Sequence, residues 1–231
     1  MKKLLLLAVG LCLAAPSAYA VQINEWVSND ISTDDQEFIE LYGTPAEDLT
    51  GLSIILIEGE GASKGIIDRV ISLDGYSIPG DGYFVIGDAL VSPDLEMSPG
   101  WIENGGNNIV LVRDLAQAGG TDIDTNDDCV EDLPIGTVVD AVGYGEPVDG
   151  DCMSYYGAVP VGPDGSYDPA GGARCCGAWA MICLNGTEPT GPGCALPDYE
   201  VGYATPGGPN DCLGPTSLDE TSWGGVKALY R

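Results

Sequence analysis

Two glutamates lie inside a strongly apolar run of this chain, which contains no histidine to act as a general base. The run is QEFIELYG, residues 36–43, and the two acids are Glu37 and Glu40. Two carboxyl groups can divide the acid and base roles of a hydrolase when both face one cleft. In a strand, however, alternate residues share a face, so residues 37 and 40 point to opposite sides. We therefore do not expect these glutamates to pair with each other.

A hydrolase that uses carboxylates alone would need two acids to converge in a cleft with raised pKa values. The candidates are Glu25, Glu37, Glu40 and Asp140. Glu25 would alternate with Ile23 and Val27 in a first strand, and could lie opposite another glutamate and bind a cation with it. Alternatively, each glutamate accepts backbone N–H bonds at a strand end or bulge. We favour this framework interpretation and expect no enzyme activity, since the chain also lacks a G-x-S-x-G nucleophile elbow.

The densest set of metal-type ligands is the run TDIDTNDDC, residues 121–129. It places four hard oxygen side chains at alternate positions, where they could bind Ca²⁺: Asp122, Asp124, Asn126 and Asp128. The run departs from an EF-hand, because Asp127 replaces the turn glycine and Leu133 stands where the bidentate glutamate should be. Strongly acidic loops are more often only solvated. The sequence leaves both interpretations of this loop open.

The strands that would position these side chains are indicated by alternating apolar residues with turn residues between them. Seven segments fit the pattern: 22–27, 37–43, 52–59, 69–73, 83–88, 108–114 and 137–145. No apolar run keeps a helical period long enough for a core helix. Several short strands at this spacing predict an all-β sandwich or barrel.

Two regions depart from this pattern. Residues 115–136 form an acidic loop, and residues 146–204 are dense in glycine, proline and cysteine with one strand-like run, AWAMICL (178–184). A stretch so poor in apolar runs builds little core. We expect disulfides to staple it to the sandwich, each stabilising the fold by about 2–4 kcal/mol. The alternative is a separate small Cys-rich domain.

The seven cysteines that follow residue 20 are all candidates for these disulfides: Cys129, Cys152, Cys175, Cys176, Cys183, Cys194 and Cys212. Their odd number leaves one thiol without a partner in the chain. The adjacent Cys175 and Cys176 are expected to bond to different partners, because neighbouring residues fit disulfide geometry poorly. The tyrosines of this region are expected to pack over the disulfides as a substitute core rather than to form a ligand platform: Tyr155, Tyr156, Tyr167 and Tyr199.

Residues 1–20 are typical of a signal peptide, with Lys2 and Lys3, an apolar run and an A-x-A site before Val21. We expect cleavage near Ala20, secretion, and a location in the extracellular space or the cell envelope. Cleavage leaves six basic residues against 36 acidic ones, a net charge of −30. Such a surface repels phosphate backbones, so we expect no nucleic-acid binding. No other run is apolar and long enough to predict a membrane span.

The C-terminal tail, residues 213–231, stands apart from the predicted strands. It ends in SLDETSWGGVKALYR, which resembles W-G-x-[IV]-K-x-[LM]-[YF]-R endings of exported proteins in some bacterial lineages. That resemblance implies a sorting or docking tag; a frayed terminus or a strap on the sandwich is the alternative. The residues of such a tag would be Trp223, Val226, Lys227, Tyr230 and Arg231.

Seven motifs occur in an order that resembles the lamin tail domain: INEWV (23–27), DDQEFIELYG (34–43), LTGLSI (49–54), IPGDGYFVIGD (78–88), NNIVLV (107–112), VVDAVGYG (138–145) and TPGGPN (205–210). The resemblance implies an immunoglobulin-like β-sandwich within residues 21–212. Bacterial members of that family are exported and mostly have no assigned activity. The chain is accordingly expected to be a non-catalytic module that binds a protein or a cell-surface component. A calcium-stabilised surface protein is the main alternative.

Overall fold

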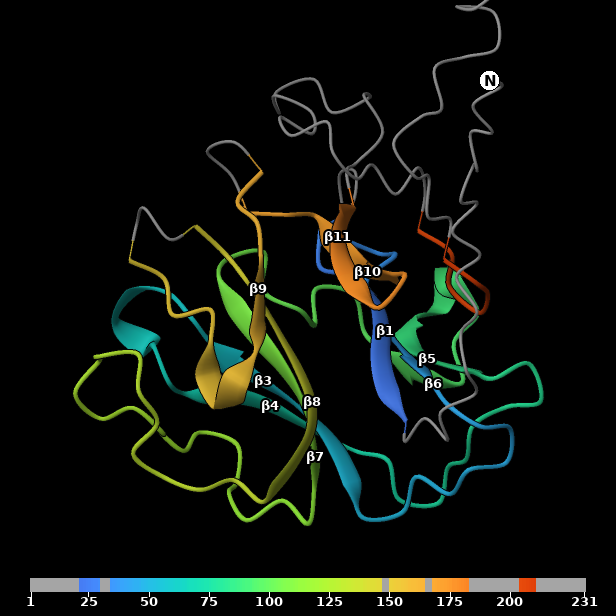
Figure 1. The fold of residues 1–231 in the computed structure, drawn as a ribbon, viewed down its shortest axis with the longest axis horizontal. Helices are drawn as coiled ribbons and strands as arrows, with labels where there is room; N and C mark the ends of the chain where they lie inside the picture. The colour runs from blue at the N-terminus through green and yellow to red at the C-terminus, as the bar shows by residue number, and fades with distance from the viewer. Residues whose placement is uncertain (1–20, 30–33, 147–149, 165–167, 183–203, 211–231) are drawn as a thin grey trace, which may run out of the picture.

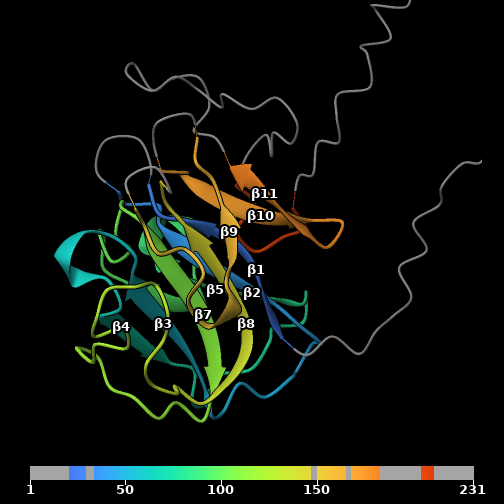
Figure 2. The same cartoon turned by 60° about the vertical axis from the view of Figure 1, so that its left-hand side comes forward.

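The chain folds into two β-sheets that pack face to face as a sandwich, as Figures 1 and 2 show. The structure is a computed structural model that describes residues 21–29, 34–146, 150–164, 168–182 and 204–210. The predicted signal peptide and C-terminal tail lie outside these residues. The predicted all-β sandwich is thereby confirmed. Within the described residues, no helix is long and apolar enough to cross a membrane.

The first sheet has six strands in the order β11-β10-β1-β2-β5-β6. Their bounds are Ala178–Ile182 (β11), Gly171–Cys175 (β10), Gln22–Val27 (β1), Phe38–Tyr42 (β2), Tyr83–Asp88 (β5) and Leu95–Met97 (β6). The second sheet has the order β4-β3-β7-β8-β9. Its strands are Ile67–Ser72 (β4), Leu52–Glu58 (β3), Asn107–Arg113 (β7), Thr137–Tyr144 (β8) and Val159–Val161 (β9). Three short 3₁₀ turns complete the described elements: Gly61–Ser63 (η1), Ala89–Val91 (η2) and Tyr155–Gly157 (η4).

The main core fills the space between the two sheets. Trp26 of β1 is fully buried there, stacked on Tyr144 of β8 with ring centroids 5.6 Å apart. Trp179 of β11 meets the same indole edge-on at 5.1 Å. Offset and edge-to-face aromatic pairs stabilise a core by about 0.5–1.5 kcal/mol beyond the area they bury. Strands far apart in the sequence, β1, β8 and β11, therefore pack together in this core.

A second apolar cluster lies on the outer face of the second sheet. Ile55 and Val110 of the sheet pack there with Ile123 of the acidic loop and with Cys152 and Tyr155 of the Cys-rich region. Because β3 and β7 are thus buried on both faces, their sequences read as continuous apolar runs rather than as alternating ones. The acidic loop is therefore part of the packing of this face.

The Cys-rich region contributes strands to both sheets, which corrects the expectation of a single strand there. β9 pairs in parallel with β8, and β10 pairs antiparallel with β1 (Figure 1). Gly172 of β10 lies opposite Trp26, and a Cβ added to it would come within 2.1 Å of the indole ring. The sequence hid these strands because VPV and GGARC lack an apolar alternation. The described strands of this region are thus paired with strands of both sheets.

One disulfide, Cys129–Cys152, joins the acidic loop to the Cys-rich region across 23 residues of sequence. Cys175 is also disulfide-bonded, whereas Cys176 is a free, exposed thiol. Cys175 and Cys176 are therefore not bonded to each other, as expected. The expectation that Cys176 also forms a disulfide, with a partner of its own, is wrong in this structure. The remaining cysteines, Cys183, Cys194 and Cys212, lie outside the described residues.

Candidate functional site

A pair of buried carboxyl groups lies where β1 and β2 run side by side. A bulge at Asn24 shifts the register, so that Ile23 faces Leu41 and Glu25 faces Glu40. The bulge also turns Ile23 and Glu25 to opposite faces, which corrects the expectation that they alternate on one face. Glu25 and Glu40 then share the outer face of the first sheet, and neither carboxyl group is exposed.

The closing segment, residues 204–210, supplies most of the donors to this pair. The Thr205 backbone N–H donates to both carboxylate oxygens of Glu25 at 3.0 and 3.1 Å, and the Thr205 hydroxyl donates to Oε2 at 3.1 Å. The Gly207 N–H donates to Glu40 Oε2 at 2.6 Å. Gly207 has a φ of +81°, a left-handed conformation that favours glycine. Each carboxyl group thus accepts a backbone N–H, as the framework interpretation requires.

Two asparagines complete the contact. Asn24 Nδ2 donates to Glu40 Oε1 at 2.6 Å and to Asn210 Oδ1 at 2.9 Å. Asn210 Nδ2 in turn donates to the Asn24 carbonyl at 3.2 Å and to the Arg174 carbonyl at 2.9 Å. The closing segment is thereby bound to β1, β2 and β10 at once.

Burial shifts the ionisation of both carboxyl groups. It raises the pKa of Glu25 to about 7, although the Thr205 donors act to lower it. Burial likewise raises the pKa of Glu40 to about 8, and the charge of the facing Glu25 acts in the same direction, against the donors from Asn24 and Gly207. Desolvation disfavours the charged form of a carboxyl group unless a cation compensates for it. The pair therefore titrates near neutral pH.

Glu37 lies on the other side of the sheet, as strand periodicity predicts. Its Oε2 accepts the backbone N–H groups of Trp101 at 2.7 Å and Ile102 at 3.3 Å, both part of the main core. Its own N–H donates to Asp88 Oδ2 at 3.0 Å. Burial first, and then the nearby charges of Asp88 and Asp34, raise the pKa of Glu37 to about 7. Glu37 anchors the loop at residues 101–102.

Asp140, the fourth carboxylate candidate, forms an ion pair that links the two sheets. Arg174 Nη2 of β10 donates to both Asp140 oxygens, at 2.6 and 2.7 Å. Asp140 Oδ2 also accepts the Ile23 N–H at 2.9 Å, and Arg174 Nε donates to the Ile23 carbonyl at 2.7 Å. The guanidinium group lies 4.4 Å from the centre of the Trp179 ring, a cation–π contact. Asp140 thus joins β8 to β1 and β10.

In the acidic loop, hydrogen bonds within the folded chain engage the four predicted calcium ligands. Asp124 is fully buried and accepts the Asp128 N–H at 3.1 Å, the Cys129 N–H at 2.8 Å and the Tyr155 hydroxyl at 2.6 Å. Asp122 Oδ1 accepts the Asp124 N–H at 3.0 Å, and Asn126 Nδ2 donates to Asp128 Oδ2 at 3.0 Å. In the described part of the chain, no three Cys, Asp or Glu side chains are grouped to hold a metal ion.

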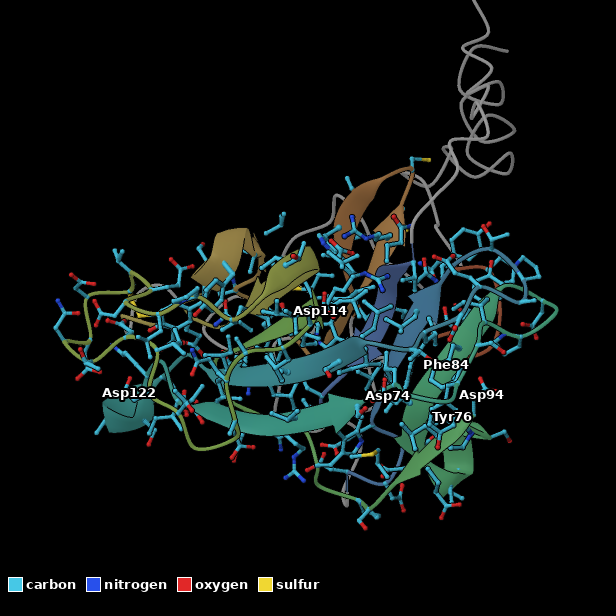
Figure 3. All side chains as sticks on the ribbon, turned by 90° about the horizontal axis from the view of Figure 1, so that it is seen from below. Asp74, Tyr76, Phe84, Asp94, Asp114 and Asp122 are labelled. Carbon is cyan, nitrogen blue, oxygen red and sulfur yellow. A yellow bond between two sulfur atoms is a disulfide. The ribbon has the colours of Figure 1, made fainter. Side chains whose placement is uncertain are left out.

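Calcium binding therefore stays a prediction that the arrangement of the loop does not support. Figure 3 shows Asp122 at one end of the molecule, well away from Asp74 and Asp94. These two acids of other loops therefore do not join the acidic loop in one patch. An ion bound by the folded chain would raise the midpoint of thermal unfolding, and adding a chelator would lower it again.

The tyrosines that the structure describes pack as expected. Tyr155 is fully buried beside Cys152 in the outer cluster. Tyr156 is half-buried, and its hydroxyl donates to the Leu133 carbonyl at 2.6 Å. Tyr167 and Tyr199 lie outside the described residues.

Family models, curated proteins and solved structures contain no match to the chain. Of the four carboxylate candidates, only Glu25 and Glu40 converge, and they do so beneath the closing segment rather than in an open cleft. Asn24, Thr205 and Asn210 complete the site. Asn24 and Glu25 belong to the motif INEWV, and Thr205 and Asn210 belong to TPGGPN. The sequence shows both motifs, but a single sequence does not show that they are in contact.

Proposed function

We propose that the chain is a secreted, lamin-tail-like β-sandwich that binds a protein or cell-surface component and does not catalyse a reaction. The observation that carries this proposal is the use of the buried carboxyl groups. Glu25, Glu37 and Glu40 accept backbone N–H groups of loops far away in sequence, and Asp140 is held by Arg174. These contacts organise the fold and engage all four candidate carboxyl groups.

Family membership is part of the same proposal. The segments INEWV, EFIELYG and TPGGPN, which carry much of the resemblance, bond directly to one another through Glu25, Glu40 and Asn24. Motifs that interact physically are expected to recur together, because each is needed to satisfy the others' buried polar groups. This mutual dependence supports reading the motifs as one framework.

The net charge indicates the chemistry of the partner. With six basic residues against 36 acidic ones after cleavage, the mature chain attracts basic surfaces and repels acidic ones over the Debye length. Electrostatic complementarity raises association rates and selects partners. We therefore expect a partner with a basic surface, and binding that weakens as salt is added.

Binding of the purified mature chain to intact bacterial cells tests the proposal. We expect saturable binding that is several-fold weaker at 500 mM than at 50 mM salt, and that exceeds the binding of an unrelated protein of equal net charge. A chain ending at residue 216 tests the tail, because loss of surface retention is expected if the tail is a docking tag. Binding no greater than that of the acidic control would refute the proposal, and so would turnover of a substrate that E40Q abolishes.

A further inference from the structure

The closing segment is held on the sandwich almost entirely by polar contacts. None of residues 204–210 is buried, and Ala204 packs against the apolar cluster on the outer face of the first sheet. The other contacts are the hydrogen bonds of Thr205, Gly207 and Asn210 described above and a backbone hydrogen bond from Gly208 to Glu40. A surface segment with so little apolar anchoring depends on its hydrogen-bond partners to stay docked.

Among the described residues, no Lys or Arg side chain is bonded to Glu25 or Glu40. On β1 and β2 the neighbouring titratable groups are the two glutamates and Tyr42. On β5 the nearest is Tyr83, whose pKa burial raises first and the charge of Glu40 raises further. On β10, Ala173 faces Glu25 and the adjacent Arg174 is bound to Asp140. The closing segment, ATPGGPN, carries no titratable side chain.

We propose that Glu25 and Glu40 form a pH-operated latch, which keeps the closing segment docked while the pair holds protons and releases it when both carboxyl groups ionise. Side chains directly opposite each other on antiparallel strands have Cβ atoms about 4.5–5.5 Å apart, and like charges there destabilise the pairing. Two buried negative charges at that spacing can be solvated only if the segment above them moves away.

The direction of the pH effect follows from proton linkage. In the docked state the two carboxyl groups have pKa values of about 7 and about 8. Once released and solvated, they return towards the usual glutamate value of about 4.3. The docked state therefore binds protons more tightly, so it is favoured at low pH and is lost as pH rises through 7 to 8.

Solvent exchange of the Thr205 and Gly207 backbone amides, measured by NMR on the full chain and corrected for intrinsic exchange, tests the latch. We expect their protection to fall by at least about tenfold between pH 6 and pH 8.5. Amides of the β3–β7 ladder should keep their protection over the same range, which separates local release from global unfolding. In E25Q the fall should be several-fold smaller, because the glutamine oxygen can still accept the Thr205 N–H and its amide can donate to the Thr205 hydroxyl, without ionising.

Two results would overturn the latch. One is protection of Thr205 and Gly207 that changes less than twofold across this pH range. The other is an E25Q profile that runs parallel to that of the unmodified chain, which would mean that Glu25 is only a structural contact. The latch does not depend on the proposed binding function, since exchange is measured without a partner.

Discussion

Asp124 illustrates at the scale of a single residue how this chain uses its buried acids. It stands in the most acidic stretch of the sequence, yet its carboxylate is fully buried and bonds to two backbone N–H groups and the Tyr155 hydroxyl. Hydrogen bonds to a charged acceptor stabilise a fold by about 1.5–3 kcal/mol each. The composition of this loop predicts that all of its acids are solvated. Only the tertiary contact with Tyr155 shows that Asp124 points into the fold.

Replacing Asp124 tests this interpretation. We expect Asp124→Ala to lower the free energy of unfolding by about 2–4 kcal/mol, because its donors are left unpaired in a buried place. Asp124→Asn keeps an acceptor and should cost less. Chemical denaturation of both variants beside Glu96→Ala, an exposed acid on β6, provides the measurement and the control. Equal effects of Asp124→Ala and Glu96→Ala would contradict the structural role.

At the scale of elements, the hairpin of β10 and β11 extends the first sheet and closes the main core. Its place depends on Gly172, which lets the backbone of β10 lie against the ring of Trp26. The hairpin also carries Arg174 and Trp179, which hold Asp140 and cover the same indole. A region whose composition predicts little core of its own is thus stabilised by pairing with β1.

Gly172→Ala should disturb this hairpin. The added Cβ would meet the Trp26 ring at 2.1 Å, so either the indole or the strand must move. Overpacking of this kind destabilises a fold by about 1–3 kcal/mol. Gly80→Ala is a matched control, because an added Cβ there meets nothing within 4 Å. Thermal unfolding followed by tryptophan fluorescence should separate the two variants, and equal midpoints would be inconsistent with the close approach.

The disulfide between the acidic loop and the Cys-rich region can be tested in the same way. Replacing both Cys129 and Cys152 by serine opens a link across 23 residues of sequence. Loop-closure entropy predicts a loss of about 3 kcal/mol, and the outer cluster around Tyr155 should loosen first. Hydrogen exchange of residues 121–136 would report this local effect. Unchanged exchange there would mean that the apolar contacts alone hold the loop.

For the molecule as a whole, the sequence predicts the β-sandwich well. It predicts poorly which distant segments are in contact. Seven strands lie within about two residues of where apolar alternation and turn residues place them, because each buries one or both faces. β6, β9 and β10 are not predicted, because β6 and β9 are only three residues long and β10 is placed by β1, about 150 positions earlier in the sequence. The facing of Glu25 and Glu40 depends on the bulge at Asn24, and their donors come from residues about 180 positions later.

Stability of the whole chain should depend on pH in the direction opposite to ordinary acid denaturation. Burial raises the pKa of Glu25, Glu37 and Glu58 to about 7 and that of Glu40 to about 8. Each group therefore stabilises the fold fully below its unfolded pKa near 4.3 and loses that contribution as pH rises through 7 to 8.

Thermal unfolding at pH 5 and pH 8.5 measures this dependence. We expect the midpoint at pH 8.5 to be lower by at least about 5 °C, since 1 kcal/mol shifts the midpoint of a domain of this size by about 2–4 °C. The double variant E25Q/E40Q should show a smaller drop. A midpoint that stays constant or rises with pH would contradict the raised pKa values of these carboxyl groups.

The covering of Glu25 and Glu40 by the closing segment is the contact on which the framework role of both acids depends. A carboxyl ¹³C NMR titration of the glutamates, with E25Q and E40Q to assign the two signals, tests it most directly. We expect midpoints of about 7 for Glu25 and about 8 for Glu40, far above those of the exposed glutamates. Midpoints for both near the ordinary value of about 4.3 would mean that the two carboxyl groups are solvated and that the closing segment does not cover them.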